Sequence, residues 1–403
     1  MFKKSPKRTY LDYASLTPID PVVVKEMEKY STNAYANPSS LYKEGVAAKK
    51  TLEEGRGRVA TFLGAHPDEV IFTSGGTEAN NLAIIGAVEA LREQGVEYRD
   101  MHVVTSVIEH SSVRECINYL NERDVKNDVV GVDQKGIVDL EHLEKVIKPN
   151  TVIVSIMTVN NEIGSIQSIR EIAKIIRRAR KKFAEGSKEQ GAEPGAFNFQ
   201  SLVQYPLFHT DAAQAPLFNE LNVEKLGVDL LTLDSSKVYG PRGVGCLYKK
   251  RNVPLEQIIH GGGQESGLRS GTEPIPQIMG FARALDLASG ERVKEIERIS
   301  VLRDQFIKGL MILGKGIRIN GALGSPHILN ISIPRIDSEF FLLQLDAQGI
   351  ACSTKSSCLR DEDESYVLKA IEADSKSSLR FSFGRWTTSG DVEKALKALT
   401  SCL

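Results

Sequence analysis

Short apolar runs alternate with longer amphipathic segments up to about residue 290. The runs have the length of strands and include 69–74, 102–108, 151–159, 228–233 and 244–248, and a further strand, PLFHTD at 206–211, ends at Asp211. Between them, the spacing of apolar positions predicts helices, such as those over 78–95 and 169–186. Buried strands that alternate with helices indicate a mainly parallel sheet covered on both faces. We therefore predict an α/β fold for this part of the chain.

The pattern changes after about residue 290. A charged amphipathic helix over 291–310 is followed by strands at 327–333 and 378–384 and a helix over 338–349. A chain of 403 residues exceeds what one apolar core usually serves. We predict a large α/β domain over 19–289 and a smaller α+β domain formed by 1–18 and 290–403. The segment 185–200, rich in Gly, Glu and Gln, is predicted to be a surface insertion.

Composition narrows the class of protein. With a formal net charge of -1, the chain as a whole exerts no strong electrostatic attraction on nucleic acid or a membrane surface. The apolar runs are shorter than a bilayer span. The basic N-terminus, MFKKSPKRTY, lacks the apolar stretch of a secretory signal. Five cysteines without CxxC spacing indicate neither a disulfide framework nor a zinc site. We expect a cytoplasmic protein with no membrane, nucleic-acid or metal partner.

Polar residues follow five of the predicted strands. In open α/β sheets, ligands bind at the carboxyl ends of the strands. These ends carry Gly75, Gly76 and Thr77, then Glu109 and His110, then Asn160 and Asn161, then Asp211 and Gln214, and finally Lys237. Taken singly, each has a structural explanation, such as a tight turn or a core histidine. A lysine at the end of a buried strand is less ordinary, because an ammonium group is costly to bury unless its charge is accommodated.

Taken together, these residues are the groups that pyridoxal 5'-phosphate (PLP) requires. Its aldehyde needs a lysine for a Schiff base, and its ring nitrogen needs a carboxylate partner. Its phosphate needs backbone N–H groups, such as those at a helix N-terminus after a glycine turn. We infer that PLP is the cofactor and that Lys237 is tolerated because its amine is joined to it.

Ten motifs occur in the order of a known family. They are YLDYASLTPIDP, NPSS, FTSGGTEANNLAI, EHSSV, VSIMTVNNEIG, FHTDAAQ, SKVYGPRGVG, GGGQESGLRSGT, GIACSTKSSC and SSLRFSFGRWTT. The chain therefore resembles the cysteine desulfurases of the NifS/IscS type, within the class V aminotransferases. The resemblance implies the PLP fold type I, in which a large domain has a mainly parallel seven-stranded sheet and a smaller domain is α+β.

The resemblance also implies which residues hold the cofactor. Lys237 would form the Schiff base, Asp211 would pair with the ring nitrogen, and His110 would stack on the ring and transfer protons. The phenolic oxygen and the phosphate would be bound by Asn161, Gln214, Gly76, Thr77, Ser236 and, from the neighbouring subunit of a homodimer, Thr272.

On the substrate side, the resemblance assigns Arg380, with Asn161 beside it, to the substrate carboxylate. It also points to one reactive cysteine. Family members read GIAVSTGSAC, and this chain reads GIACSTKSSC, so Cys352 takes an apolar position and Cys358 the reactive one. The polar surroundings of Cys358 suit a sulfur carrier, which must be exposed and ionisable. We regard Cys116, Cys246 and Cys402 as structural or incidental.

One departure from the family pattern lies beside the lysine. Relatives have Ser-x-His-Lys, whereas this chain has Asp234-Ser235-Ser236-Lys237. A carboxylate near a phosphate repels it. Three outcomes are open: Asp234 turns away, a cation such as Arg269 neutralises it, or the affinity for PLP is reduced.

The resemblance thus implies a PLP-dependent cysteine desulfurase. It would convert L-cysteine to L-alanine, hold the sulfur as a persulfide on Cys358, and pass it to an acceptor protein for iron–sulfur cluster assembly or tRNA thiolation. Two alternatives remain open. One is a selenocysteine lyase or another class V PLP enzyme, and the other is a catalytically weakened homologue that acts as a binding partner.

Overall fold

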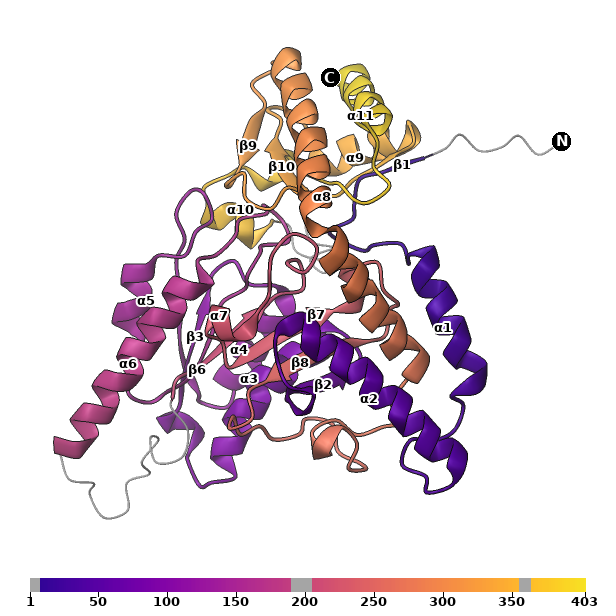
Figure 1. The fold of residues 1–403 in the computed structure, drawn as a ribbon. Coiled ribbons are helices and arrows are strands. Elements are labelled where there is room, and N and C mark those ends of the chain that lie inside the picture. Colours follow the sequence, from indigo (N-terminus) through magenta and orange to yellow (C-terminus); the bar gives the residue numbers. More distant parts are fainter. Residues whose placement is uncertain (1–7, 190–204, 355–363) are drawn as a thin grey trace.

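A seven-stranded sheet forms the centre of the larger part of the molecule (Figure 1). The computed structural model describes residues 8–189, 205–354 and 364–403. The strand order is β2-β8-β7-β6-β5-β3-β4. β8 runs antiparallel to both of its neighbours, and all other pairs are parallel, which confirms the predicted mainly parallel sheet. The strands are β2 (Val70–Thr73), β3 (His102–Ser106), β4 (Lys126–Val130), β5 (Thr151–Ser155), β6 (Leu207–Asp211), β7 (Leu230–Asp234) and β8 (Gly245–Lys249).

Helices cover both faces of this sheet. Successive side chains of a strand point to opposite faces, so Val70 and Phe72 enter one apolar core and Ile71 enters the other. The core on the Ile71 side is closed by α3 (Gly76–Arg92) and α4 (Ser111–Asn121). The opposite core is closed by α1 (Pro21–Asn33), α2 (Lys43–Leu63), α5 (Leu140–Val146), α6 (Ile169–Glu189), α7 (Val223–Leu226) and the first half of α8 (Ile275–Leu313). None of the helices described is long and apolar enough to span a membrane.

The smaller part, in orange and yellow at the top of Figure 1, has its own apolar core. Leu11 from the start of the chain packs there with Phe306 and Phe381. The elements are the antiparallel strands β9 (Arg318–Asn320), β10 (Ile328–Ser332) and β12 (Ser378–Ser382), the parallel pair β1 (Thr9–Tyr10) and β11 (Ile350–Ala351), and helices α9 (Ser338–Ala347), α10 (Tyr366–Ala370) and α11 (Ser389–Cys402).

The predicted domain boundary at residue 290 falls inside a single helix. α8 crosses this position, with Leu285 in a core of the large sheet and Ile299 in the core of the smaller part. The boundary therefore stays a prediction. The predicted insertion at 185–200 begins within α6, which continues to Glu189, and its remainder lies outside the described residues. Short 3-10 turns are η1 (Pro67–Glu69), η2 (Tyr98–Asp100), η3 (Ser235–Lys237), η4 (Glu265–Gly267) and η6 (Ser375–Ser377).

Candidate active site

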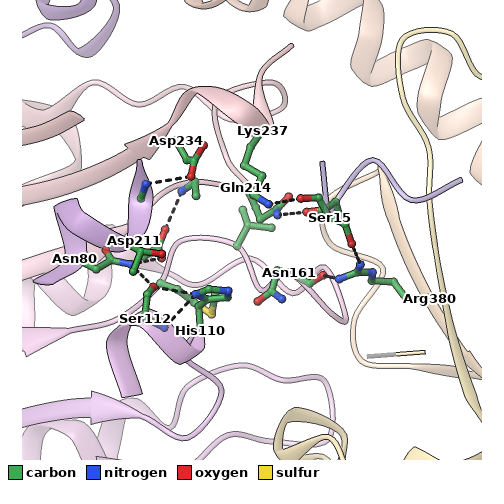
Figure 2. Close-up of a pocket in the computed structure, with 16 residues that line it drawn as sticks. Ser15, Asn80, His110, Ser112, Asn161, Asp211, Gln214, Asp234, Lys237 and Arg380 are labelled. Atoms are coloured by element: carbon green, nitrogen blue, oxygen red, sulfur yellow. Dashed lines mark hydrogen bonds between the residues drawn. The ribbon is translucent and has the colours of Figure 1, made fainter. Parts of the chain in front are cut away.

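The carboxyl ends of the central strands surround a cavity of about 180 Å³ (Figure 2). The sequence predicted polar groups at the carboxyl ends of the strands, and residues at or after the ends of β2, β3, β5, β6 and β7 do line this cavity. Eight of the residues predicted to bind the cofactor or the substrate line this cavity: Gly76, Thr77, His110, Asn161, Asp211, Gln214, Lys237 and Arg380.

Lys237 enters the cavity from the turn that follows β7. The strand ends at Asp234, and η3 then carries the lysine to the cavity wall. Its Nζ donates to the backbone oxygen of Ser15, so the dipole of this carbonyl helps to stabilise the ammonium charge. The strand-end lysine is therefore half-buried and places its amine among the other polar groups of the cavity.

Asp211, at the end of β6, presents a buried carboxylate to the same cavity. Its Oδ1 accepts the backbone N–H of Ala213 at 2.9 Å, and its Oδ2 accepts Asn80 Nδ2 at 2.8 Å. In the described part of the chain no cationic side chain forms an ion pair with Asp211. A buried carboxylate without a cation is costly, so this site is suited to a ligand that brings a positive charge.

His110 is tied to Asp211 through two side chains that the sequence did not single out. The backbone N–H of Ser112 donates to His110 Nδ1 at 3.2 Å, so the proton of the neutral ring lies on Nε2. Ser112 Oγ lies 2.8 Å from the same Nδ1. Asn80 Nδ2 donates to both Ser112 Oγ and Asp211 Oδ2, each at 2.8 Å. This one amide therefore fixes the imidazole and the carboxylate relative to each other.

Gln214 is held by a buried histidine from the smaller part. Its Nε2 donates to the backbone oxygen of Ala14 at 2.8 Å, and its Oε1 lies 3.2 Å from His327 Nε2. His327 Nδ1 in turn lies 2.7 Å from Ser325 Oγ. Burial, aided by the charge of Arg380, lowers the pKa of His327 to about 3. His327 is therefore neutral at physiological pH, and its Nε2–H fixes the orientation of the Gln214 amide.

His327 should make the protein less stable in acid. Below the ordinary histidine pKa of 6.5, the unfolded chain binds a proton that folded His327 does not bind. The contribution of neutral His327 to the free energy of unfolding is fully present above that pH. It is lost below it, by about 1.4 kcal/mol for each pH unit. We expect His327→Gln to remove this part of the slope in urea unfolding between about pH 7 and pH 5. His260→Gln, at an exposed position, should keep the wild-type slope. Equal slopes for the two variants would contradict this assignment.

Arg380 lies on β12 and reaches the cavity from the smaller part. Its Nη1 donates to the backbone oxygen of Asn161 at 2.8 Å, and its Nη2 donates to Asp12 Oδ1 at 2.8 Å and Ser15 Oγ at 2.7 Å. Its Nε is buried and has no hydrogen-bond partner within the described ranges. Asp12 and Ser15 thus position the guanidinium, and two of its five N–H donors, that of Nε and one on Nη1, have no hydrogen-bond partner among the described residues.

Two neighbouring asparagines after β5 have different roles. Asn160 closes a turn, because its Oδ1 accepts the backbone N–H groups of Glu162 and Ile163 and its Nδ2 donates to the oxygen of Ile108. Asn161 lines the cavity instead. The turn explanation therefore applies to the first residue, and only the second is available to a ligand.

The sequence profile of the class-V aminotransferases matches residues 9–184 and 199–395. The chain belongs to this family. It is 37% identical over 400 residues to the cysteine desulfurase IscS of Dictyoglomus turgidum, covering 98% of this chain and 94% of that protein. A solved NifS-like protein is 33% identical with a TM-score of 0.86 and 98% coverage of both chains. A structure described as SspA in complex with cysteine is 29% identical, with a TM-score of 0.74 and coverage of 94% and 100%.

These relationships make the chain a PLP-dependent class-V enzyme of the cysteine desulfurase type. The cavity residues fit this cofactor. Asp211 has no cationic partner among the described residues, and a protonated ring nitrogen would supply one. Lys237 presents an amine for the aldehyde. Asn80 also lines this wall, and its buried Oδ1 has no hydrogen-bond partner in the described structure.

Three predicted site residues of this class-V enzyme are not placed on the cavity wall. Ser236 lies in η3 and donates to Asp234 through both its N–H and its hydroxyl. Thr272 is exposed in the segment between η4 and α8. Cys358 lies outside the described residues. The roles of all three, including the contact of Thr272 with a second subunit, stay predictions.

Glu109 is a buried acid directly before His110 in the chain. Its Oε1 accepts Ser106 Oγ and the backbone N–H of Met157. Burial, with a contribution from the charge of Asp211, raises the pKa of Glu109 to about 8. Glu109 is therefore protonated at neutral pH and adds no second negative charge behind the cofactor site.

Proposed function

We propose that this class-V enzyme is a cysteine desulfurase that converts L-cysteine to L-alanine and keeps the sulfur as a persulfide on Cys358. The observation that carries the proposal is the single cavity that unites Lys237, Asp211, His110 and Arg380. The relative described as SspA in complex with cysteine supports an amino acid of this kind as the ligand.

Each residue of the cavity has a proposed role toward the cofactor or the substrate. PLP supplies an electron sink for the substrate α-carbon when it is bound. Lys237 would hold the aldehyde, and its Nζ would be the base that moves the α-proton. Asp211 would keep the ring nitrogen protonated, because a carboxylate favours the charged form of a neighbouring base. His110, fixed by Ser112, presents Nε2 for a second proton transfer.

The sulfur step needs an ionised thiol. The Cys358 thiolate would attack the substrate sulfur, so that the carbon–sulfur bond breaks, a sulfur–sulfur bond forms, and the released carbon takes a proton to become alanine. No external oxidant is needed, because the cysteine carbon is reduced as the enzyme sulfur is oxidised.

The other cysteines are poorly suited to this role. Burial raises the pKa of the thiols of Cys116, Cys246 and Cys352, and it also raises the pKa of the partly exposed Cys402. A raised pKa keeps a thiol protonated and unreactive at neutral pH. These four unpaired cysteines support the assignment of Cys358 as the nucleophile and fit a reducing, cytoplasmic setting.

Arg380 should set the affinity for the substrate carboxylate. We expect Arg380→Lys, which keeps the charge but loses the planar fork, to raise KM for L-cysteine by about 10- to 100-fold, with a smaller change in kcat. Cysteamine lacks the carboxylate, so its turnover should be hardly affected. A preference for cysteine over cysteamine that stays at the wild-type value would contradict the proposed carboxylate contact.

The reaction itself is tested by measuring alanine released from L-cysteine with and without added PLP. The proposal predicts PLP-dependent release, with one sulfur recovered for each alanine. Selenocysteine and cysteine sulfinate should be run in parallel, because faster turnover of either would favour another class V lyase. No alanine from any of the three, despite bound PLP, would favour a homologue that serves only as a binding partner.

We also propose a homodimer that passes its persulfide sulfur to an acceptor protein for iron–sulfur cluster assembly or tRNA thiolation. The position of Thr272 on an exposed segment, outside its own cavity wall, supports a contact with a second subunit. Sedimentation of the PLP-loaded protein tests the dimer, and a monomer at micromolar concentration would contradict it.

A further inference from the structure

The donors expected to bind the cofactor phosphate converge on one carboxylate. Asp234 Oδ2 accepts the N–H of Gly76 at 3.0 Å. Asp234 Oδ1 accepts the backbone N–H of Ser236 at 2.8 Å and its hydroxyl at 2.6 Å. Asp234 itself lines the cavity, so the carboxylate lies where these groups face a ligand (Figure 2). Of the three outcomes open from the sequence, the structure excludes the one in which Asp234 turns away.

Local structure explains why the carboxylate lies there. Asp234 ends β7 and caps the first turn of η3, which directs its side chain toward the start of α3. A helix N-terminus favours a negative charge, because its first N–H groups lack intrahelical partners. Gly76 permits the close approach, since a Cβ added there would meet the Cβ and Oδ2 of Asp234 at 3.3 Å.

Arg269 does not neutralise this charge. Its guanidinium pairs with Glu78, with Nε 2.9 Å from Oε1. Within the described ranges no other cationic side chain forms an ion pair with Asp234. The second of the three outcomes is therefore also excluded, because no ion pair among the described residues offsets this carboxylate at the expected phosphate site.

We propose that Asp234 is an internal competitor for the cofactor phosphate and lowers the affinity for PLP relative to the same aldehyde without phosphate. The proposal requires PLP to be the cofactor. A phosphate bound at the start of α3 needs the N–H of Gly76 and the donors of Ser236, which Asp234 already uses. The carboxylate must either move and lose three hydrogen bonds or stay and repel the phosphate.

The test compares PLP with pyridoxal, which has the same ring and aldehyde but no phosphate. Each aldehyde is titrated onto the whole chain freed of PLP, and binding is followed by its visible absorption. Asp234→Asn and Asp234→Ser should each tighten PLP by about tenfold or more while changing pyridoxal less than about twofold. The matched control is Asp139→Asn, which alters the capping aspartate of α5, a residue that does not line the cavity, and should leave both affinities unchanged.

The ratio of the two affinities separates the possible results. Pyridoxal binding at wild-type strength shows that a variant is folded. If Asp234→Asn does not fold, Asp234→Ser is used for the comparison instead. An unchanged PLP-to-pyridoxal ratio in the folded variants would overturn the role of Asp234 and leave the proposed desulfurase intact. Failure of both aldehydes to bind the wild-type protein would overturn the two proposals together.

Discussion

The Lys237→Ala protein is expected to lose at least about 10³-fold in kcat for alanine release, because it lacks both the cofactor attachment and the base for the α-proton. Loss of the ammonium group also leaves the oxygen of Ser15 without this donor, so the fold should be checked by its melting temperature. Activity is measured as alanine formed from L-cysteine at saturating PLP.

Lys237→Arg is the matched control for this result. Arginine keeps the positive charge beside Ser15 but cannot condense with an aldehyde at neutral pH. We expect it to be as inactive as the alanine variant. Activity above about a tenth of wild type in either variant would mean that another group performs the lysine chemistry.

The second large effect is expected for Cys358→Ser. This variant should still bind PLP and show its yellow colour, but its sulfur transfer should fall by about 10³-fold or more, because a serine hydroxyl is not ionised at neutral pH. Persulfide on the protein is measured by mass spectrometry after incubation with L-cysteine. The expected result is a persulfide in the wild type and none in the variant.

Cys352→Ser provides the comparison within the same motif. Cys352 is buried, and burial raises the pKa of its thiol, so it should not carry the persulfide. We expect this variant to retain both activity and the persulfide at Cys358, with some loss of stability. Normal sulfide and alanine production by Cys358→Ser, or a persulfide found on Cys352, would contradict the nucleophile assignment.

The strands and their polar ends were predictable because the signals are local. Apolar runs mark β3, β5 and β7, and parallel strands bring their carboxyl ends to one edge, so Asp211 and Lys237 could be expected to meet. The direction of β8 was less accessible. It returns antiparallel to β7 after the turn at 240–243, and an apolar run carries no information on direction.

The contacts that position the site residues were not predictable, because they join distant parts of the chain. His327 meets Gln214 across 113 positions, and Arg380 meets Asp12 across 368 positions. Asn80 is fully buried in α3, and the sequence shows this only weakly, as a polar residue within a largely apolar helix. The side-chain direction of Asp234 was also undetermined, since it depends on Gly76, 158 positions earlier.

The central claim is the covalent link between the cofactor and one lysine, and borohydride reduction tests it most directly. PLP-loaded protein is reduced, digested and mapped by mass spectrometry. The account predicts one reduced cofactor on the peptide that contains Lys237, and no such label in the Lys237→Arg protein. An unmodified Lys237 peptide, or a label on a different lysine, would contradict it.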